Sequence, residues 1–234
     1  MTTRLNLLWA HQQAAPLSQA ELNWLGNVLP DHSWLAMGPD QPQPGVEGET
    51  PSAPHIRHGR RQAQYRMGRV LASCALNAMT GADHTVSRRA DGSPAWPDHS
   101  VGSITHTQGL AAAIVASTRH YAGLGIDAER WRQLSPGALS YVCTAAERAA
   151  SPNAALLSFS AKEAIFKTLD PLGVSPLRFQ DVTVIETDGR LAFAPTRQCG
   201  WVKALEALEG VALCAGEHVV TLVWIRRDAG DALV

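Results

Sequence analysis

Apolar and polar residues alternate along several short stretches of this chain, and turn-forming residues separate the stretches. Alternation with a period of two predicts strands, and the clearest pair lies within 179–195, on either side of the turn Thr187-Asp188-Gly189. The same pattern predicts further strands over 4–10, 83–89, 101–107, 110–118, 122–130 and 218–225. We expect the strands over 110–118 and 122–130 to be adjacent and joined near 119–121.

Apolar residues at helical spacing predict helices between these strands. The expected helices are 18–29, 60–79, a segment that begins at Thr144, and 153–169 after Pro152. Ser18 with Glu21, and Thr144 with Glu147, have the spacing of a capping box. The segment 38–54 is rich in Pro and Gly and predicts a surface loop. Because helices and strands interleave without regular βαβ alternation, we expect an α+β fold.

Composition narrows the function classes only a little. The 234 residues carry a formal charge of −1, with 45% hydrophobic and 18% charged residues, so nothing attracts the whole chain to nucleic acid or to an anionic membrane. No stretch reaches the roughly 20 apolar residues of a membrane span, and the N-terminus does not resemble a signal peptide. The four cysteines form no C-x-x-C pair, which favours free buried thiols in a cytoplasmic protein over a zinc site.

Two carboxylates stand one residue apart in the strand "GLGIDAERW". Asp127 and Glu129 share a strand face with Gly125, and we expect the glycine to leave open space beside them. Such a face can admit Mg²⁺ together with a phosphate. The alternative is a strand end in solvent, where Arg130 or Arg132 neutralises both acids. Taken alone, the D-x-E pattern favours this alternative.

The segment "LLSFSAKEAIFKTLD" holds two of the chain's three lysines, Lys162 and Lys167. At 100° per residue, Glu163 lies on the stripe of Leu156, Phe159 and Phe166, with Lys167 beside it. A carboxylate in such surroundings must be paired, bind a metal or take up a proton. The alternative is an ordinary surface Glu–Lys pair one turn apart, which does not require aromatic residues on both neighbouring turns.

Two upstream segments could bind anions. In "GSITHT", the side chains of Thr105, His106 and Thr107 can donate to an anion, although a lone histidine more often has a structural partner. In "HIRHGRRQAQYRMGR", Arg61, Tyr65 and Gly68 share a helix face. The cluster comprises Arg57, Arg60, Arg61, Arg66 and Arg69, and its guanidinium groups suit phosphate as well as a solvated surface.

Together these motifs resemble the 4′-phosphopantetheinyl transferases. Gly125–Glu129 matches the family pattern G-[IV]-D-x-E, and Phe159–Lys167 matches [FW]-x-x-K-E-[AS]-x-x-K. The resemblance is to the large monomeric surfactin type, and within it to the branch containing the enterobactin synthetase component D. That branch's R-x-x-[EQ]-[FY]-x-x-G-R appears at Arg61–Arg69, and its P-x-W-P and G-S-[IV]-[ST]-H segments appear at Pro94–Pro97 and Gly102–His106.

The resemblance implies a fold and a reaction. Enzymes of this family consist of two similar α+β halves related by a pseudo-twofold, here 1–120 and 121–234, with coenzyme A bound in the cleft between them. They transfer 4′-phosphopantetheine from coenzyme A to a serine of an apo acyl, aryl or peptidyl carrier protein and release 3′,5′-ADP. By this resemblance the protein is a cytoplasmic monomer that needs Mg²⁺, and it serves siderophore, polyketide or nonribosomal peptide synthesis.

The resemblance also implies roles for individual residues. It assigns Mg²⁺ to Asp127, Glu129 and Glu163, and catalysis to Asp127, Glu163 and Lys167, with Glu163 as the base. It places coenzyme A against Arg57, Arg61, Thr105, His106 and Lys167, with Lys162 as another contact or as a supporting residue. Ser93 stands where the family often has Lys or Arg, and Arg88 or Arg89 could replace that charge.

Two rival functions use the same residues. One is a regulator that binds coenzyme A and carrier proteins without transferring anything. The other is a different Mg²⁺-dependent phosphotransferase or phosphohydrolase. The carboxylates Asp127, Glu129 and Glu163, kept together with Lys167, argue against a passive binding protein, because such a protein has no need of a metal site.

Overall fold

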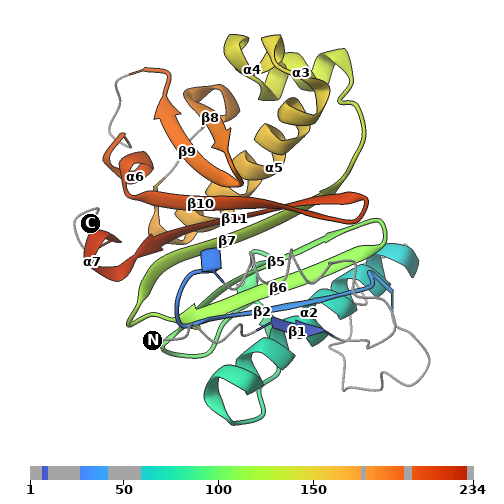
Figure 1. Cartoon of the computed structure of the whole chain (residues 1–234). Coiled ribbons are helices and arrows are strands. Elements are labelled where there is room, and N and C mark those ends of the chain that lie inside the picture. Colours follow the sequence, from blue (N-terminus) through green and yellow to red (C-terminus); the bar gives the residue numbers. More distant parts are fainter. Residues whose placement is uncertain (1–6, 10–26, 42–58, 175–177, 198–201, 231–234) are drawn as a thin grey trace. The chain divides into compact units, whose positions relative to one another are not determined.

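The computed structural model describes residues 7–9, 27–41, 59–174, 178–197 and 202–230. The chain divides into two compact units, Met1–Thr118 and Arg119–Val234, which we describe separately. Both units contain a sheet made largely of antiparallel strands and one long helix (Figure 1). The expected α+β class is therefore confirmed.

The first unit contains a four-stranded sheet and the long helix α2, Gly59–Thr80. Its strands, in the spatial order β1-β2-β6-β5, are Leu7–Trp9, Ser33–Gly38, Leu110–Ser117 and Ser100–Thr107. The expected helix over 60–79 is thus confirmed. A short ribbon of β3, Ser87–Arg88, and β4, Pro94–Ala95, follows α2 in the sequence.

The core of this unit lies between α2 and the sheet. Leu71 and Ala75 of α2 pack with Ala113 and Val115 of β6, and the residues just before β3 and just after β4, Val86 and Trp96, join the same cluster. Helix α2 packs closely on a side chain of β5 at Gly68, where a Cβ would lie 2.6 Å from Cγ2 of Ile104. The glycine on this helix face therefore serves packing against a neighbouring strand.

The second unit contains a five-stranded antiparallel sheet in the order β7-β11-β10-β9-β8 (Figure 1). Its strands are Tyr121–Arg130, His218–Arg226, Leu208–Ala215, Arg190–Pro195 and Val182–Thr187. Its helices are α3 Pro136–Val142, α4 Ala145–Ala149, α5 Pro152–Leu169, α6 Val202–Glu206 and α7 Arg227–Gly230, with 3-10 turns at Asp170–Leu172 and Phe179–Asp181.

Local sequence explains where several of these elements begin and end. Ser135, Thr144 and Ser151 each accept a hydrogen bond from the first turn of the following helix, and Thr144 forms the expected capping box with Glu147. The β8–β9 hairpin turns at Asp188 and Gly189, whose φ values are 50° and 77°. Positive φ at both central residues of a two-residue hairpin loop is the conformation that Asp-Gly favours.

One expectation about the sheets is wrong. The strands over 110–118 and 122–130 do not pair with each other, because β6 lies between β2 and β5, while β7 pairs with β11. Both edges of β6 are thus occupied by strands of the first unit, and the change of sheet occurs between Ser117 and Tyr121. The expected helix over 18–29 and loop over 38–54 lie mostly outside the described residues.

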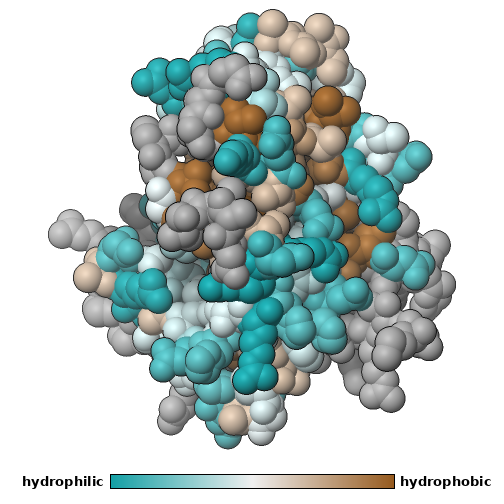
Figure 2. All heavy atoms as spheres, turned by 90° about the vertical axis from the view of Figure 1, so that its left-hand side faces the viewer, coloured by the Kyte–Doolittle hydropathy of each residue, from teal (hydrophilic) through white to brown (hydrophobic). Residues whose placement is uncertain are grey.

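The described surface carries few large apolar side chains. Tyr141 and Ile185 are the exposed examples, at 72% and 50%. On the face shown in Figure 2, brown apolar groups are separate from one another and bordered by teal polar groups. Cys74, Cys143 and Cys214 are free thiols, as expected, but the expected burial holds only for Cys143, since Cys74 and Cys214 are exposed. A bilayer-spanning helix is not found in the described part of the chain, since no helix there combines sufficient length with sufficient apolarity.

The glycines of β7 set the distance between this strand and α5. A Cβ at Gly125 would lie 2.1 Å from the carbonyl oxygen of Ala164, and one at Gly123 would lie 2.6 Å from that of Thr168. The expected open space beside Gly125 is therefore wrong, because the backbone of α5 fills it. This close packing brings the helix that carries Glu163 directly against the strand that carries Asp127.

Substitution of Gly125 tests this packing. We expect Gly125→Ala to lower the free energy of unfolding by about 2 kcal/mol or more, because the added methyl group meets rigid helix backbone. Chemical denaturation of Gly137→Ala is the matched control, since no atom lies within 4 Å of a Cβ at Gly137. Equal stability of the two variants would contradict the packing argument.

Candidate active site

The second unit gathers acidic residues and a lysine from β7 and α5. Nζ of Lys167 lies 2.7 Å from Oδ1 of Asp127 and donates to the carbonyl oxygen of Ile126 at 2.9 Å. Asp127 is 6% exposed, whereas Glu129 and Glu163 are only partly buried. The sequence motifs of the strand and the later helix therefore meet in space, as their resemblance to one family implies.

Burial and mutual repulsion act on these carboxylates. Burial raises the pKa of Glu163, the charge of Asp127 raises it further, and Lys167 opposes both effects. Burial also raises the pKa of Glu129, with added contributions from Asp127 and Glu163 and opposition from Arg132. Each of the three carboxylates thus interacts electrostatically with the other two, so they form one acidic cluster.

The carboxylates of the cluster are of the kind that bind Mg²⁺, but in this structure two of them form ion pairs with basic side chains. Among the residues that the structure describes, no three His, Cys, Asp or Glu side chains are arranged to hold one metal ion. Lys167 contacts Asp127, and Arg132 lies 3.3 Å from Glu129. Carboxylate oxygens are the protein ligands that Mg²⁺ prefers, so the chemistry of this donor set fits the ion.

The alternative, in which Arg130 or Arg132 neutralises both Asp127 and Glu129, holds only in part. Arg132 pairs with Glu129, while Arg130 pairs with Glu217 at 2.7 Å. Asp127 is paired with Lys167 of α5, a residue 40 positions away in the sequence. The strand is therefore not a solvated end neutralised only by its neighbouring arginines.

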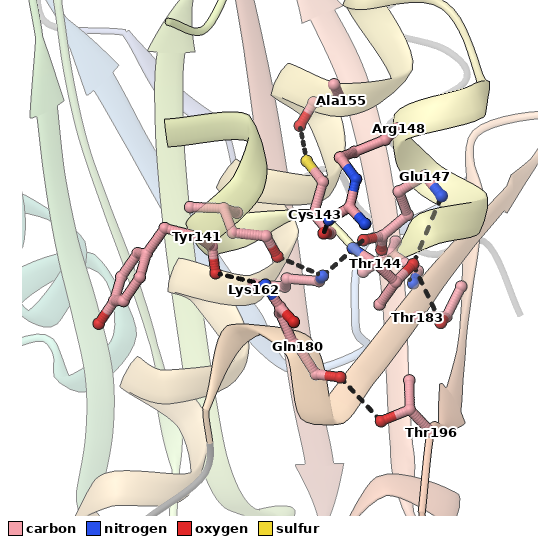
Figure 3. Close-up of polar contacts among 12 residues, drawn as sticks. Tyr141, Cys143, Thr144, Glu147, Arg148, Ala155, Lys162, Gln180, Thr183 and Thr196 are labelled. Carbon is pink, nitrogen blue, oxygen red and sulfur yellow. Dashed lines mark hydrogen bonds and ion pairs between the residues drawn. The ribbon is translucent and has the colours of Figure 1, made fainter. Parts of the chain in front are cut away.

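Lys162 lies away from this cluster, in the interior. Its side chain is 1% exposed, and Nζ donates to Oε2 of Glu147 at 2.6 Å and to the carbonyl oxygen of Val142 at 2.9 Å (Figure 3). Burial lowers the pKa of Lys162, and its hydrogen bond with Glu147 opposes this effect. Of the two roles expected for Lys162, such burial favours the supporting role over a contact with coenzyme A.

The other expected contacts lie in the first unit. Arg61 is exposed on α2, and Thr105 and His106 lie near the end of β5, Thr105 buried and His106 exposed. Arg57 lies outside the described residues. The acidic cluster belongs to the second unit and these residues to the first.

Two buried charged residues were missed by the sequence reasoning. Glu147 was expected only to cap a helix, yet its carboxylate also pairs with Lys162. Arg69 was expected within a basic cluster, yet it is 4% exposed and lies 5.0 Å from the ring centroid of Tyr65. A hydrophilic residue in a capping motif or on an arginine-rich helix gives no sequence signal of such burial.

The fold and the cluster together define an α+β protein in which three carboxylates and a lysine from β7 and α5 lie close together. Comparison with known proteins agrees: residues 56–116 match the 4′-phosphopantetheinyl transferase N-terminal domain, and residues 123–223 match the 4′-phosphopantetheinyl transferase superfamily. The chain belongs to the 4′-phosphopantetheinyl transferase superfamily.

Individual relatives support this membership. The chain is 34% identical over 187 residues to the 4′-phosphopantetheinyl transferase Svp of Streptomyces mobaraensis, covering 74% of this chain and 76% of the relative. It is 34% identical over 155 residues to PptT of Mycobacterium tuberculosis, covering 62% and 68%. A third relative, Npt of Nocardia iowensis, is 33% identical over 131 residues, covering 53% and 59%.

The electrostatics of Glu163 predict an unusual stability effect. A carboxyl group whose pKa is raised in the folded state costs stability once it ionises, so the cost is present above the folded pKa and vanishes below the ordinary value of 4.5. We therefore expect Glu163→Gln to raise the melting temperature at pH 7 to 8 and to leave it unchanged below about pH 4. Glu206→Gln, on an exposed position of α6, is the control for thermal denaturation across pH. A melting temperature lowered by Glu163→Gln at neutral pH would contradict this reasoning.

Proposed function

We propose that this protein transfers 4′-phosphopantetheine from coenzyme A to a serine of an apo carrier protein. The serine oxygen forms a bond to the β-phosphorus of coenzyme A, the bond from that phosphorus to the bridging oxygen breaks, and 3′,5′-ADP leaves with the bond's electrons. The observation that carries this proposal is the meeting of Asp127, Glu129 and Glu163 with Lys167, in a chain of this superfamily.

The residues of the cluster suit different parts of this reaction. Lys167 is the cation beside the carboxylates, and we assign it to the phosphate oxygens, where an ammonium group stabilises developing negative charge. Glu163 is assigned to accept the proton of the serine hydroxyl. Its raised pKa supports this role, because a base works best when its pKa approaches the working pH.

Asp127, Glu129 and Glu163 are the residues that would hold Mg²⁺. When bound, the ion would supply positive charge to the diphosphate oxygens and relieve repulsion among the carboxylates. Lys167 and Arg132 lie beside these carboxylates through their contacts with Asp127 and Glu129. Cations next to the carboxylates could also meet phosphate oxygens, which is consistent with a site that binds metal and diphosphate together.

We assign the nucleotide end of coenzyme A to the first unit, at Arg61, Thr105, His106 and a buried arginine, Arg69. Among the described residues, Nη1 of Arg69 is buried without a hydrogen-bond partner. A buried guanidinium group left in this state costs free energy unless an anion satisfies it. Burial lowers the pKa of Arg69, Tyr65 opposes this effect, and the charge of Arg88 makes a smaller lowering contribution, so two cations lie close enough to repel each other.

Arg88 is the better candidate to replace the charge missing at Ser93. A Cβ at Gly92 would lie 2.7 Å from Nη2 of Arg88, so this guanidinium group folds over the turn that carries Ser93. Ser93 itself donates its hydroxyl to Asp91 at 2.7 Å. Arg88 therefore supports the proposed binding of the 3′-phosphate, together with Arg69.

A transfer assay tests the proposed function directly. The protein is incubated with coenzyme A, Mg²⁺ and a panel of apo acyl, aryl and peptidyl carrier proteins, and mass spectrometry detects one phosphopantetheine group on the carrier serine. We expect transfer to at least one carrier and none in the presence of a chelator. Release of inorganic phosphate without carrier modification would indicate a phosphohydrolase instead, and binding without transfer would indicate a regulator.

Variants of the acidic cluster test the assigned residues. We expect Asp127→Ala and Glu163→Ala to abolish transfer and Lys167→Ala to lower its rate by about 100-fold, because each removes charge from the reacting phosphates. A readout that does not depend on transfer is the melting temperature, which Mg²⁺ should raise in the unchanged protein and not in Glu163→Ala. Full activity in either carboxylate variant would show that the metal site is misplaced.

Removal of Arg88 tests the nucleotide end. We expect Arg88→Ala to raise the KM for coenzyme A by about tenfold, the usual effect of losing a charged contact, and to leave the KM for 3′-dephospho-coenzyme A unchanged. Arg89→Ala is the matched control, since Arg89 is an exposed arginine of the same ribbon. Equal effects of Arg88→Ala on both substrates would contradict a contact with the 3′-phosphate.

A further inference from the structure

The buried pair of Glu147 and Lys162 joins four separate segments. Oε2 of Glu147 accepts from Nζ of Lys162 at 2.6 Å and from the backbone N–H of Thr144 at 2.7 Å, while Oε1 accepts from the N–H of Val184 at 2.8 Å. Lys162 also donates to Val142. One carboxylate thus connects α4 and α5 with the edge strand β8, and the ammonium group adds the end of α3 (Figure 3).

Stability alone does not account for this arrangement. Glu147 is 4% exposed and Lys162 is 1% exposed, so both charges are removed from water. Desolvation of two charges commonly offsets their attraction, and apolar residues of similar volume often serve stability equally well. A buried ion pair instead fixes the relative positions of the segments that carry it, because moving either charge away from its partner raises the free energy of the folded protein.

The pair helps to fix the orientation of α5 about its own axis. One side of the helix is attached to the sheet, where Ser160 and Thr221 form a hydrogen bond of 2.9 Å between their hydroxyl groups. Lys162 attaches a different side to α3 and α4. These two attachments lie at different angles about the axis, so both resist rotation, in addition to the close packing of α5 on Gly123 and Gly125.

Rotation of α5 matters because Glu163 follows Lys162 directly. A carboxylate roughly 6 Å from a helix axis moves by about 1 Å when the helix turns by about 10°. A displacement of that size at a reacting group can lower a rate by about 100-fold. The side-chain direction of Glu163 toward Asp127 thus depends on the residue before it.

We propose that Glu147 is a positioning residue, which acts through Lys162 to fix the rotation of α5 and thereby the placement of Glu163 and Lys167 against Asp127. This role rests on the proposed transferase function. It concerns residues that touch neither substrate nor metal, since both members of the pair are buried in the packing of α3, α4, α5 and β8.

Three variants separate positioning from simple stabilisation. Glu147→Gln leaves the buried ammonium group of Lys162 without an ionised partner, and Lys162→Met leaves the buried carboxylate of Glu147 without a cation. We expect both variants to have a lower melting temperature and a kcat lower by about tenfold or more. The double variant Glu147→Gln/Lys162→Met removes both charges at nearly constant volume. We expect its melting temperature to exceed those of the single variants but to stay below that of the unchanged protein, because an amide oxygen can replace only one of the two carboxylate oxygens that accept from Thr144 and Val184. We expect its kcat to stay low and its KM for coenzyme A to change by less than about twofold.

Asp181→Asn is the matched control in the same unit. Asp181 is 6% exposed and pairs with Arg197 at 2.8 Å, so its substitution also removes a buried carboxylate from an ion pair. We expect this variant to lose stability and to keep its kcat, measured well below its melting temperature. The same assay on the unchanged protein tests transferase activity separately, and its absence would overturn both proposals.

The positioning role would be overturned by any of three results. The first is a double variant whose kcat recovers together with its melting temperature, since stability alone would then explain the single variants. The second is a folded Glu147→Gln protein with kcat within about twofold of the unchanged protein. The third is a loss of kcat in Asp181→Asn as large as in Glu147→Gln.

Discussion

The close contact between α5 and β7 is the constraint on which the second unit depends. Gly123 and Gly125 let the helix backbone approach the strand more closely than any side chain would permit. This approach brings Lys167 within 2.7 Å of Asp127 and places Glu163 within range of the same carboxylate. Gly125 of the G-x-D-x-E segment and Gly123 before it therefore serve the site indirectly, by making room for a helix and not for a ligand.

A cluster of buried, mutually repelling carboxylates lowers the free energy of unfolding. Burial and mutual repulsion raise the pKa of both Glu129 and Glu163, which means that ionisation of either carboxyl opposes folding. Lys167 and Arg132 reduce this cost without removing it. A site that retains unfavourable charge is suited to a ligand that supplies positive charge, and this agrees with the function proposed for a member of this superfamily.

The sequence predicted most of the fold and the membership of the acidic cluster, because both follow from local patterns. Helical spacing located α2 and α5, and Asp-Gly located the β8–β9 turn. Long-range pairing was less accessible: the separation of β6 from β7 depends on which distant strands occupy their edges, and no local pattern records that. The space beside Gly125 was misjudged for the same reason, since the atom that fills it belongs to Ala164.

The two lysines of α5 show most clearly what a local sequence pattern cannot predict, namely whether a charged side chain is buried or accessible. Lys162 and Lys167 belong to one motif and lie on one helix, yet Lys162 is 1% exposed and Lys167 is 31% exposed. The difference arises from their partners, since Lys162 pairs with Glu147 of α4 and Lys167 pairs with Asp127 of β7. A basic residue in a motif can thus contact substrate or support the fold. The choice is made by the position of an acid elsewhere in the chain, because a buried ammonium group is tolerated only where a carboxylate meets it.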